Sequence, residues 1–168
     1  MVTLSGFVIS VLLTLLASNV LGGVGIGVAF ALLIVFVIAG VIFDVIGVAT
    51  TAADEKAFHS MSARRVKGST QAVWIVKNTD KVTSLCNDVV GDIFGIISGA
   101  AGAIIAMQIG RMSAGVDVDM AQLLITGVTA GITIGGKALG KSIALRFSNR
   151  IVFMVGRVLY FFHFSMGR

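Results

Sequence analysis

Residues 24–50 form an apolar run that contains a single charged side chain, Asp44. A helix that crosses a lipid bilayer needs about 20 consecutive apolar residues. One soluble core could not bury such a run in a chain of 168 residues. The whole chain is 57% hydrophobic and only 12% charged, whereas soluble domains average about 25% charged residues. These features predict an all-α integral membrane helical bundle.

Four apolar segments divide the chain, at about 4–21, 24–50, 85–109 and 120–136. The Gly22–Gly23 pair predicts a tight turn between the first two. The first segment carries several polar side chains, so it either spans the membrane or re-enters it. It has no basic region before it, so we expect a membrane segment rather than a cleaved signal peptide. We therefore predict one membrane domain, 1–168, with three to four transmembrane helices.

Two basic amphipathic stretches, about 53–83 and 142–165, predict helices at the membrane surface. The first should break near Gly68, and Asn78–Asp80 should cap the helix that follows. Of the 13 lysines and arginines, 12 lie within 56–81 or 137–168. The positive-inside rule therefore places loop 52–84 and the C-terminus in the cytoplasm, and we expect a bacterial plasma membrane. Because the basic residues flank the spans, we expect them to face lipid headgroups and not nucleic acid.

Two stripes of glycines repeat every four residues, one in the third span and one in the fourth. Small residues at this spacing let another helix approach closely in lipid. We expect packing within or between subunits, and a homodimer as the oligomer. The glycines are Gly91, Gly95, Gly99, Gly127, Gly131 and Gly135.

Three aspartates, Asp44, Asp88 and Asp92, lie inside the apolar segments. A carboxylate at the centre of a membrane helix costs roughly 3 kcal/mol, so it usually faces a cavity, an ion or a charged partner. Asp88 and Asp92 are one helical turn apart, and Asn87 adds a neutral oxygen. Such oxygens suit a hard cation such as Mg²⁺, and suit Na⁺ or a proton nearly as well. The alternative is that Asp88 and Asp92 lie among headgroups, or pair with Lys81 or Lys137.

The other polar residues predict structural roles. We expect Thr50 and Thr51 to donate to helix carbonyls, and Cys86 to be a small buried thiol. His59, His163 and Trp74 are expected to anchor the chain at the membrane interface. The sequence contains no catalytic triad, zinc motif or phosphate-binding loop, so we do not expect an enzyme.

Four motifs follow one another along the chain. They are F-D-V-I-G-V-A-T-T-A-A-D (43–54), R-R-V-K-G-S-T-Q-A-V-W-I-V-K-N-T-D-K-V (64–82), L-C-N-D-V-V-G-D-I (85–93) and K-A-L-G-K-S-I-A-L-R-F-S-N-R-I (137–151). Their order resembles the transmembrane domain of the CNNM/CorC family of magnesium transporters, over about residues 40–155. The resemblance implies a cation site that includes Asn87, at the position of the first asparagine in the family's G-N motif.

The chain departs from that family at several positions. Lys137 falls where the family has a glutamate, Gly140 where it has a proline, and Gly91 where it has a second asparagine, while Lys141 matches the family's lysine. The chain ends at Arg168, so we expect no CBS-pair domain and no nucleotide-regulated gating.

Taken together, these patterns predict transport or binding of a divalent cation, Mg²⁺ by analogy, at a metal site formed by Asp44, Asn87, Asp88 and Asp92. Two alternatives remain open: a pathway for monovalent cations or protons that uses the same carboxylates, and a membrane scaffold or accessory subunit that transports nothing.

Overall fold

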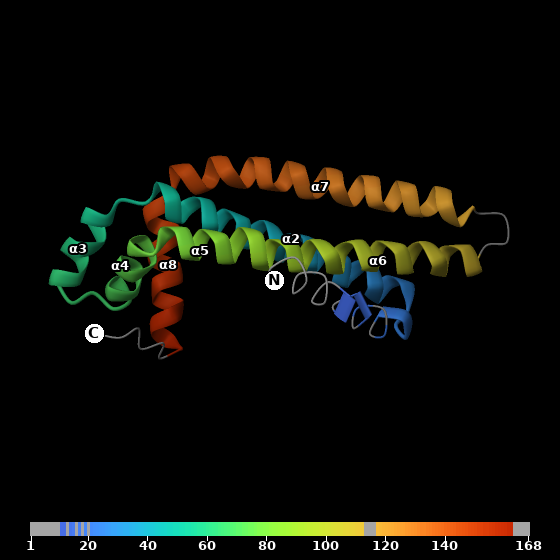
Figure 1. Cartoon of the computed structure of the whole chain (residues 1–168), viewed down its shortest axis with the longest axis horizontal. Helices are drawn as coiled ribbons and strands as arrows, with labels where there is room; N and C mark the ends of the chain where they lie inside the picture. The colour runs from blue at the N-terminus through green and yellow to red at the C-terminus, as the bar shows by residue number, and fades with distance from the viewer. Residues whose placement is uncertain are drawn as a thin grey trace. The chain divides into compact units, whose positions relative to one another are not determined.

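The computed structural model describes residues 11–12, 14–15, 17, 19, 21–112 and 117–162. Within these residues every regular element is helical, as the sequence predicts, and no strand is present (Figure 1). The elements are α2 (Ile26–Ala52), α3 (Glu55–Ala63), α4 (Ser69–Lys77), α5 (Thr79–Ser84), η1 (Leu85–Val90), α6 (Gly91–Met112), α7 (Val118–Arg146) and α8 (Ser148–Phe161).

Three helical stretches are long and apolar enough to cross a membrane: Ile26–Ala52, Thr79–Met112 and Val118–Arg146. They correspond to the predicted spans 24–50, 85–109 and 120–136, but the last two are longer. A helix of 29 residues is about 44 Å long, whereas the hydrocarbon core is about 30 Å thick. The apolar runs of the sequence therefore predicted where these helices lie, but did not include their polar ends.

The predicted first span, 4–21, lies mostly outside the described residues. Its described positions from Val11 to Leu21 are helical, and the chain turns at Gly23–Val24, as the Gly22–Gly23 pair predicts. The predicted surface role of His163 also falls outside the described residues.

The described chain divides into two compact units, and α2 and α7 each contribute to both. Unit 1 comprises residues 1–41 and 91–136, and unit 2 comprises 42–90 and 137–168. In unit 1, buried side chains of α2 such as Ala29 and Leu33 form one core with Ala101 and Ile105 of α6. The Phe36 and Phe94 rings add to the contact between these helices, with centroids 6.3 Å apart.

Unit 2 has its own core, in which Phe58 of α3, Ala72 and Ile75 of α4, and Val152 of α8 are buried. Three of the six buried residues of this core are alanines, Ala49, Ala72 and Ala144, which lets the helix backbones lie close together. Gly68 and Gly156 show how close: a Cβ on Gly68 would lie 2.8 Å from the Arg157 Cα atom, and one on Gly156 would lie 2.6 Å from the Gly68 carbonyl oxygen.

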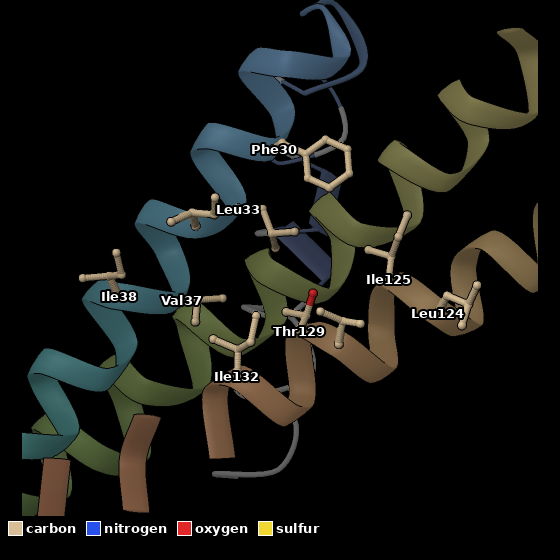
Figure 2. A pocket seen from close by; sticks show the side chains of 10 residues that line it. Phe30, Leu33, Val37, Ile38, Leu124, Ile125, Thr129 and Ile132 are labelled. Carbon is tan, nitrogen blue, oxygen red and sulfur yellow. The ribbon is translucent and has the colours of Figure 1, made fainter. Parts of the chain in front are cut away.

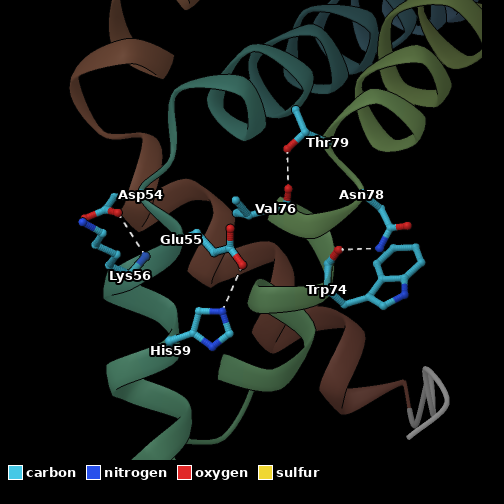
Figure 3. Close-up of polar contacts among 8 residues, drawn as sticks. All are labelled: Asp54, Glu55, Lys56, His59, Trp74, Val76, Asn78 and Thr79. Atoms are coloured by element: carbon cyan, nitrogen blue, oxygen red, sulfur yellow. Dashed lines mark hydrogen bonds and ion pairs between the residues drawn. The ribbon is translucent and has the colours of Figure 1, made fainter.

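The predicted helix break at Gly68 is confirmed. Gly68 adopts a left-handed φ of 90° and forms the N-cap of α4, and Arg65 has a φ of 54° in the same turn. At the start of α3, Asp54 accepts a hydrogen bond from the Lys56 backbone nitrogen at 3.0 Å (Figure 3). The Asp54 backbone nitrogen in turn donates to Asn149 Oδ1 at 2.7 Å, which ties α3 to α8.

The predicted cap at Asn78 is correct in position and wrong in mechanism. Asn78 is the N-cap of α5, but its side chain makes no capping hydrogen bond. Its Nδ2 atom instead donates backwards to the Trp74 carbonyl at 2.9 Å, and Thr79 Oγ1 donates to the Val76 carbonyl at 2.6 Å (Figure 3). Because both side chains bond to the last turn of α4, α4 and α5 are separated by a single residue.

The Gly68→Ala substitution should destabilise unit 2. The left-handed φ costs an L-residue about 1–2 kcal/mol, and the overlap with the Arg157 backbone should bring the total to about 2–4 kcal/mol. Thermal unfolding of the purified protein in detergent measures the loss. Gly27→Ala is the matched control, because a Cβ there meets nothing within 4 Å. Equal melting temperatures for the two variants would contradict the prediction.

Candidate functional site

An ion pair joins two of the candidate spans in unit 2. The Lys137 Nζ atom of α7 lies 3.2 Å from Asp44 Oδ1 of α2. The Asp44 side chain is 17% exposed and the Lys137 side chain 38%. The sequence interpretation offered Lys137 as a partner of Asp88 or Asp92, but the structure pairs it with Asp44. Because Lys137 brings the compensating charge, Asp44 does not need an ion to be tolerated on an apolar helix.

Asn87 lies against α2 on the same face as Asp44. Gly47, three residues after Asp44, has no Cβ, and a Cβ at that position would overlap the Asn87 Oδ1 atom. Thr83 Oγ1 donates to the Gly47 carbonyl at 3.3 Å, so this turn of α2 also contacts the last turn of α5. The glycine therefore allows the Asn87 amide to approach the α2 backbone directly.

The Asn87 Oδ1 atom is buried and has no hydrogen-bond partner among the described residues. A buried acceptor without a donor costs about 1–3 kcal/mol. Asn87 belongs to η1, a six-residue π-helix between α5 and α6. Turns of this kind are rare and occur frequently at functional sites. Neither the ion pair nor the helix packing accounts for this unpaired oxygen.

The two remaining predicted ligands, Asp88 and Asp92, are both exposed. Asp88 accepts a hydrogen bond from Ser84 Oγ at 2.8 Å, one turn earlier. Asp92 lies in the first turn of α6, in unit 1. In the part of the chain that the structure describes, no three His, Cys, Asp or Glu side chains gather in a group that could hold a metal ion. The structure thus brings Asp44 together with Lys137, and the Asn87 side chain together with the Gly47 backbone.

The glycine stripes do not pack against other helices within the described chain. At five of these glycines, an added Cβ atom would have no described atom within 4 Å of it. They are Gly95, Gly99, Gly127, Gly131 and Gly135. Close contacts occur at other glycines: Gly40 faces Phe94, Gly102 faces Ile125 and Gly136 faces Val41. The predicted packing within the subunit is therefore absent at these five positions, and packing between subunits stays a prediction.

Unit 1 contains an apolar groove of about 610 Å³ between α2 and α7. Its walls are formed by five residues from each helix, which include Phe30 and Val37 of α2 and Leu124 and Ile132 of α7 (Figure 2). Thr129 brings the only hydroxyl group among the lining residues. A groove with this lining fits hydrocarbon and offers no ligand set for a cation.

Several smaller predictions are confirmed. Thr50 Oγ1 donates to the Ile46 carbonyl at 2.9 Å, and Thr51 Oγ1 donates to the Val48 carbonyl at 2.7 Å. Cys86 is a buried free thiol. The expected anchoring of His59 at the membrane interface stays a prediction; its Nε2 atom lies 3.0 Å from Glu55 Oε1, within hydrogen-bond distance, on the exposed side of α3 (Figure 3).

Comparison with protein-family models, with curated proteins and with solved structures finds no match for this chain.

Lys137→Met should destabilise the protein because it leaves the Asp44 carboxylate unpaired. Breaking a fully buried ion pair costs about 3–5 kcal/mol, and because Lys137 is 38% exposed we expect about 1–3 kcal/mol. The double variant Asp44→Asn/Lys137→Met should recover most of this loss. Thermal unfolding in detergent, analysed as a double-mutant cycle, measures the coupling. Additive losses in the two single variants would contradict a direct interaction.

Proposed function

We propose that this chain is an integral membrane protein that binds a small hard cation and carries it across the bilayer, with Asp44 as the main ligand. The buried Asn87 oxygen without a donor is the observation that carries the proposal. It lies against Gly47, three residues after Asp44 on α2, and in this proposal the carboxylate and the neutral oxygen serve one cation. A cation or its bound water would satisfy the acceptor that the protein leaves unpaired.

Lys137 has a defined role in this proposal. Its ammonium group neutralises Asp44 when no cation is bound, and the cation displaces it. A transporter passes through an empty state in each cycle. In that state the ion pair lowers the free-energy cost of a carboxylate in the membrane. Lys137 also stands where the resembled family has a glutamate, so an acidic ligand of that family is replaced here by an exchangeable positive charge.

The cation best supported by the resemblance is Mg²⁺. This ion keeps several of its waters and binds through one or two carboxylates, so Asp44 and Asn87, with Asp88 or Asp92 acting at an earlier or later step, form a sufficient set. A second candidate is a monovalent cation or a proton. The one-to-one pairing of Asp44 and Lys137 favours it, because Na⁺ or H⁺ brings the Asp44 carboxylate one positive charge, as the ammonium group that it displaces does.

The topology and the oligomer belong to the same proposal. Loop 52–84 and the C-terminus face the cytoplasm, because 12 of the 13 basic residues lie in or beside them. Two subunits pack through the open glycine stripes. No residue in the most apolar part of α7 is fully buried within the described chain, and the glycine stripe meets nothing there, so this helix has a face free for a second copy.

Asp44→Asn should abolish cation flux in proteoliposomes that contain the purified protein. The matched control is Asp80→Asn, which removes an exposed carboxylate from α5 and should leave flux within twofold of the unmodified protein. Flux is measured with an ion-sensitive dye inside the vesicles, for Mg²⁺, for Na⁺ and for a pH gradient in turn. Flux with Mg²⁺ alone supports the first candidate, and flux with Na⁺ or protons supports the second.

The same assay tests the remaining predicted ligands. If Asp88→Ala/Asp92→Ala leaves Mg²⁺ binding and flux unchanged, these carboxylates have no part in the site. If the unmodified protein moves none of the three ions, the transport proposal fails and the chain is better described as a membrane scaffold or accessory subunit.

Replacing Gly131 by isoleucine should weaken self-association. The isoleucine side chain would keep the two helix backbones apart where small residues allow close contact. Gly127 and Gly135, one turn before and one turn after Gly131, belong to the same contact surface. Chemical crosslinking and energy transfer between labelled copies in vesicles measure the dimer fraction, which we expect to fall at least fivefold. Leu139→Ile is the control, because it changes an exposed α7 residue outside the stripe. Equal dimer fractions in the two variants would remove the glycines from the interface.

A further inference from the structure

A second cavity lies in unit 2, where the turn between α3 and α4 meets the end of α8. It has a volume of about 320 Å³ and is lined mainly by polar and charged residues. The side chains that matter for its chemistry are Ser62, Arg65, Lys67, Thr70, Gln71 and Tyr160. None of the proposed cation ligands lines it, so it is separate from the site above.

The charge of this cavity is positive. Arg65 and Lys67 line it, and no aspartate or glutamate does. Both cations are exposed, and neither forms an ion pair among the described residues. Lys137, in contrast, is neutralised by Asp44. Two adjacent positive charges without a partner favour an anion, and a phosphate group accepts hydrogen bonds from both.

The backbone of the turn adds donors to the same wall. Gly68 has a left-handed φ of 90°, a conformation found in concave anion-binding turns, whereas the Arg65 N–H already donates to the Ser62 carbonyl at 2.9 Å. Gly68 gives α4 no side-chain cap, and the Ser69 N–H donates to the Val66 carbonyl at 3.1 Å, which leaves the N–H groups of Thr70 and Gln71 in the first turn of α4. These features fit an anion at the end of a nine-residue helix.

The neutral groups of the cavity indicate more than a bare phosphate. Ser62, Thr70 and Tyr160 line the cavity as well. A hydroxyl group both donates and accepts hydrogen bonds, so these three side chains suit hydroxyl groups of a ligand, which a simple phosphate dianion lacks. The combination fits a phosphate ester that carries free hydroxyls.

We propose that this cavity binds a polyol phosphate, the chemistry of a phosphatidylglycerol headgroup or of a soluble glycerol phosphate. Arg65 and Lys67 hold the phosphate, and Ser62, Thr70 and Tyr160 exchange hydrogen bonds with the polyol hydroxyls. The cavity lies in the segment between the ends of two candidate spans, Ala52 and Thr79, which is headgroup depth in an inserted protein. The lipid form of the ligand therefore rests on the proposed membrane insertion, and neither form depends on cation transport.

The test is a binding titration of the purified full-length protein in detergent micelles. Trp74 is the only tryptophan and lies three residues after Gln71 on α4, so its fluorescence reports on this region. The probes are short-chain phosphatidylglycerol, short-chain phosphatidylcholine and glycerol 1-phosphate. We expect saturable binding of phosphatidylglycerol at least tenfold tighter than of phosphatidylcholine.

Charge variants locate the site. Arg65→Asn removes the charge and keeps a residue that tolerates the left-handed φ, and combined with Lys67→Gln it should weaken phosphatidylglycerol binding at least tenfold. The control pair Arg64→Gln/Lys77→Gln removes the same charge outside the cavity and should stay within twofold. Tyr160→Phe is a second variant that keeps the ring, and it should weaken binding several-fold even if the turn variants fold poorly.

The outcomes separate the two sources. Competition by glycerol 1-phosphate at comparable concentration assigns the soluble ligand, and binding of phosphatidylglycerol without such competition assigns the lipid. Equal losses in the cavity and control pairs, or equal binding of phosphatidylglycerol and phosphatidylcholine, would overturn the proposal. Ion flux is unaffected by this test, so failure here leaves the cation proposal standing.

Discussion

A charged side chain on a long apolar helix needs a partner, and the pairing of Asp44 with Lys137 meets that need in this chain. The two groups lie 3.2 Å apart on α2 and α7. Asp44 is the only charged residue of α2, so no charged side chain of its own helix can compensate it. In an apolar setting this attraction is strong, because the competing hydration is weak. The relative register of α2 and α7 in unit 2 is therefore set by electrostatics as well as by packing.

The sequence contained the information for this pair, but the predicted end of the fourth span concealed it. A span that stops at 136 leaves Lys137 in a surface tail, whereas α7 continues to Arg146. Asp44 lies eight residues before the end of α2 and Lys137 nine before the end of α7, and the predicted topology runs both helices in the same direction. The two charges thus stand at similar depth. Apolarity alone ends a span too early when a lysine lies inside the helix.

Local chemistry predicted other parts well. Gly68 marked a break because only a residue without Cβ fits a left-handed turn against the Arg157 backbone. Asn78 marked a helix boundary because short polar side chains bond to nearby backbone. The π-helix at Leu85–Val90 could not be predicted, since its wider turn depends on how Asn87 meets Gly47 on a different helix. The open faces of the glycine stripes likewise depend on tertiary packing.

One core positions both proposed sites of unit 2. Ala49 follows Asp44 by five residues and Ala144 follows Lys137 by seven, and both are buried with Phe58, Ala72 and Val152. The same α4 that contributes Ala72 carries Thr70 and Gln71 on the wall of the basic cavity. Because alanine and glycine at these contacts leave little room for adjustment, a shift of α4 or α8 would be transmitted to the ends of α2 and α7. The distance between Asp44 and Lys137 thus depends on packing five to seven residues away, in a core shared with the cavity that we assign to a polyol phosphate.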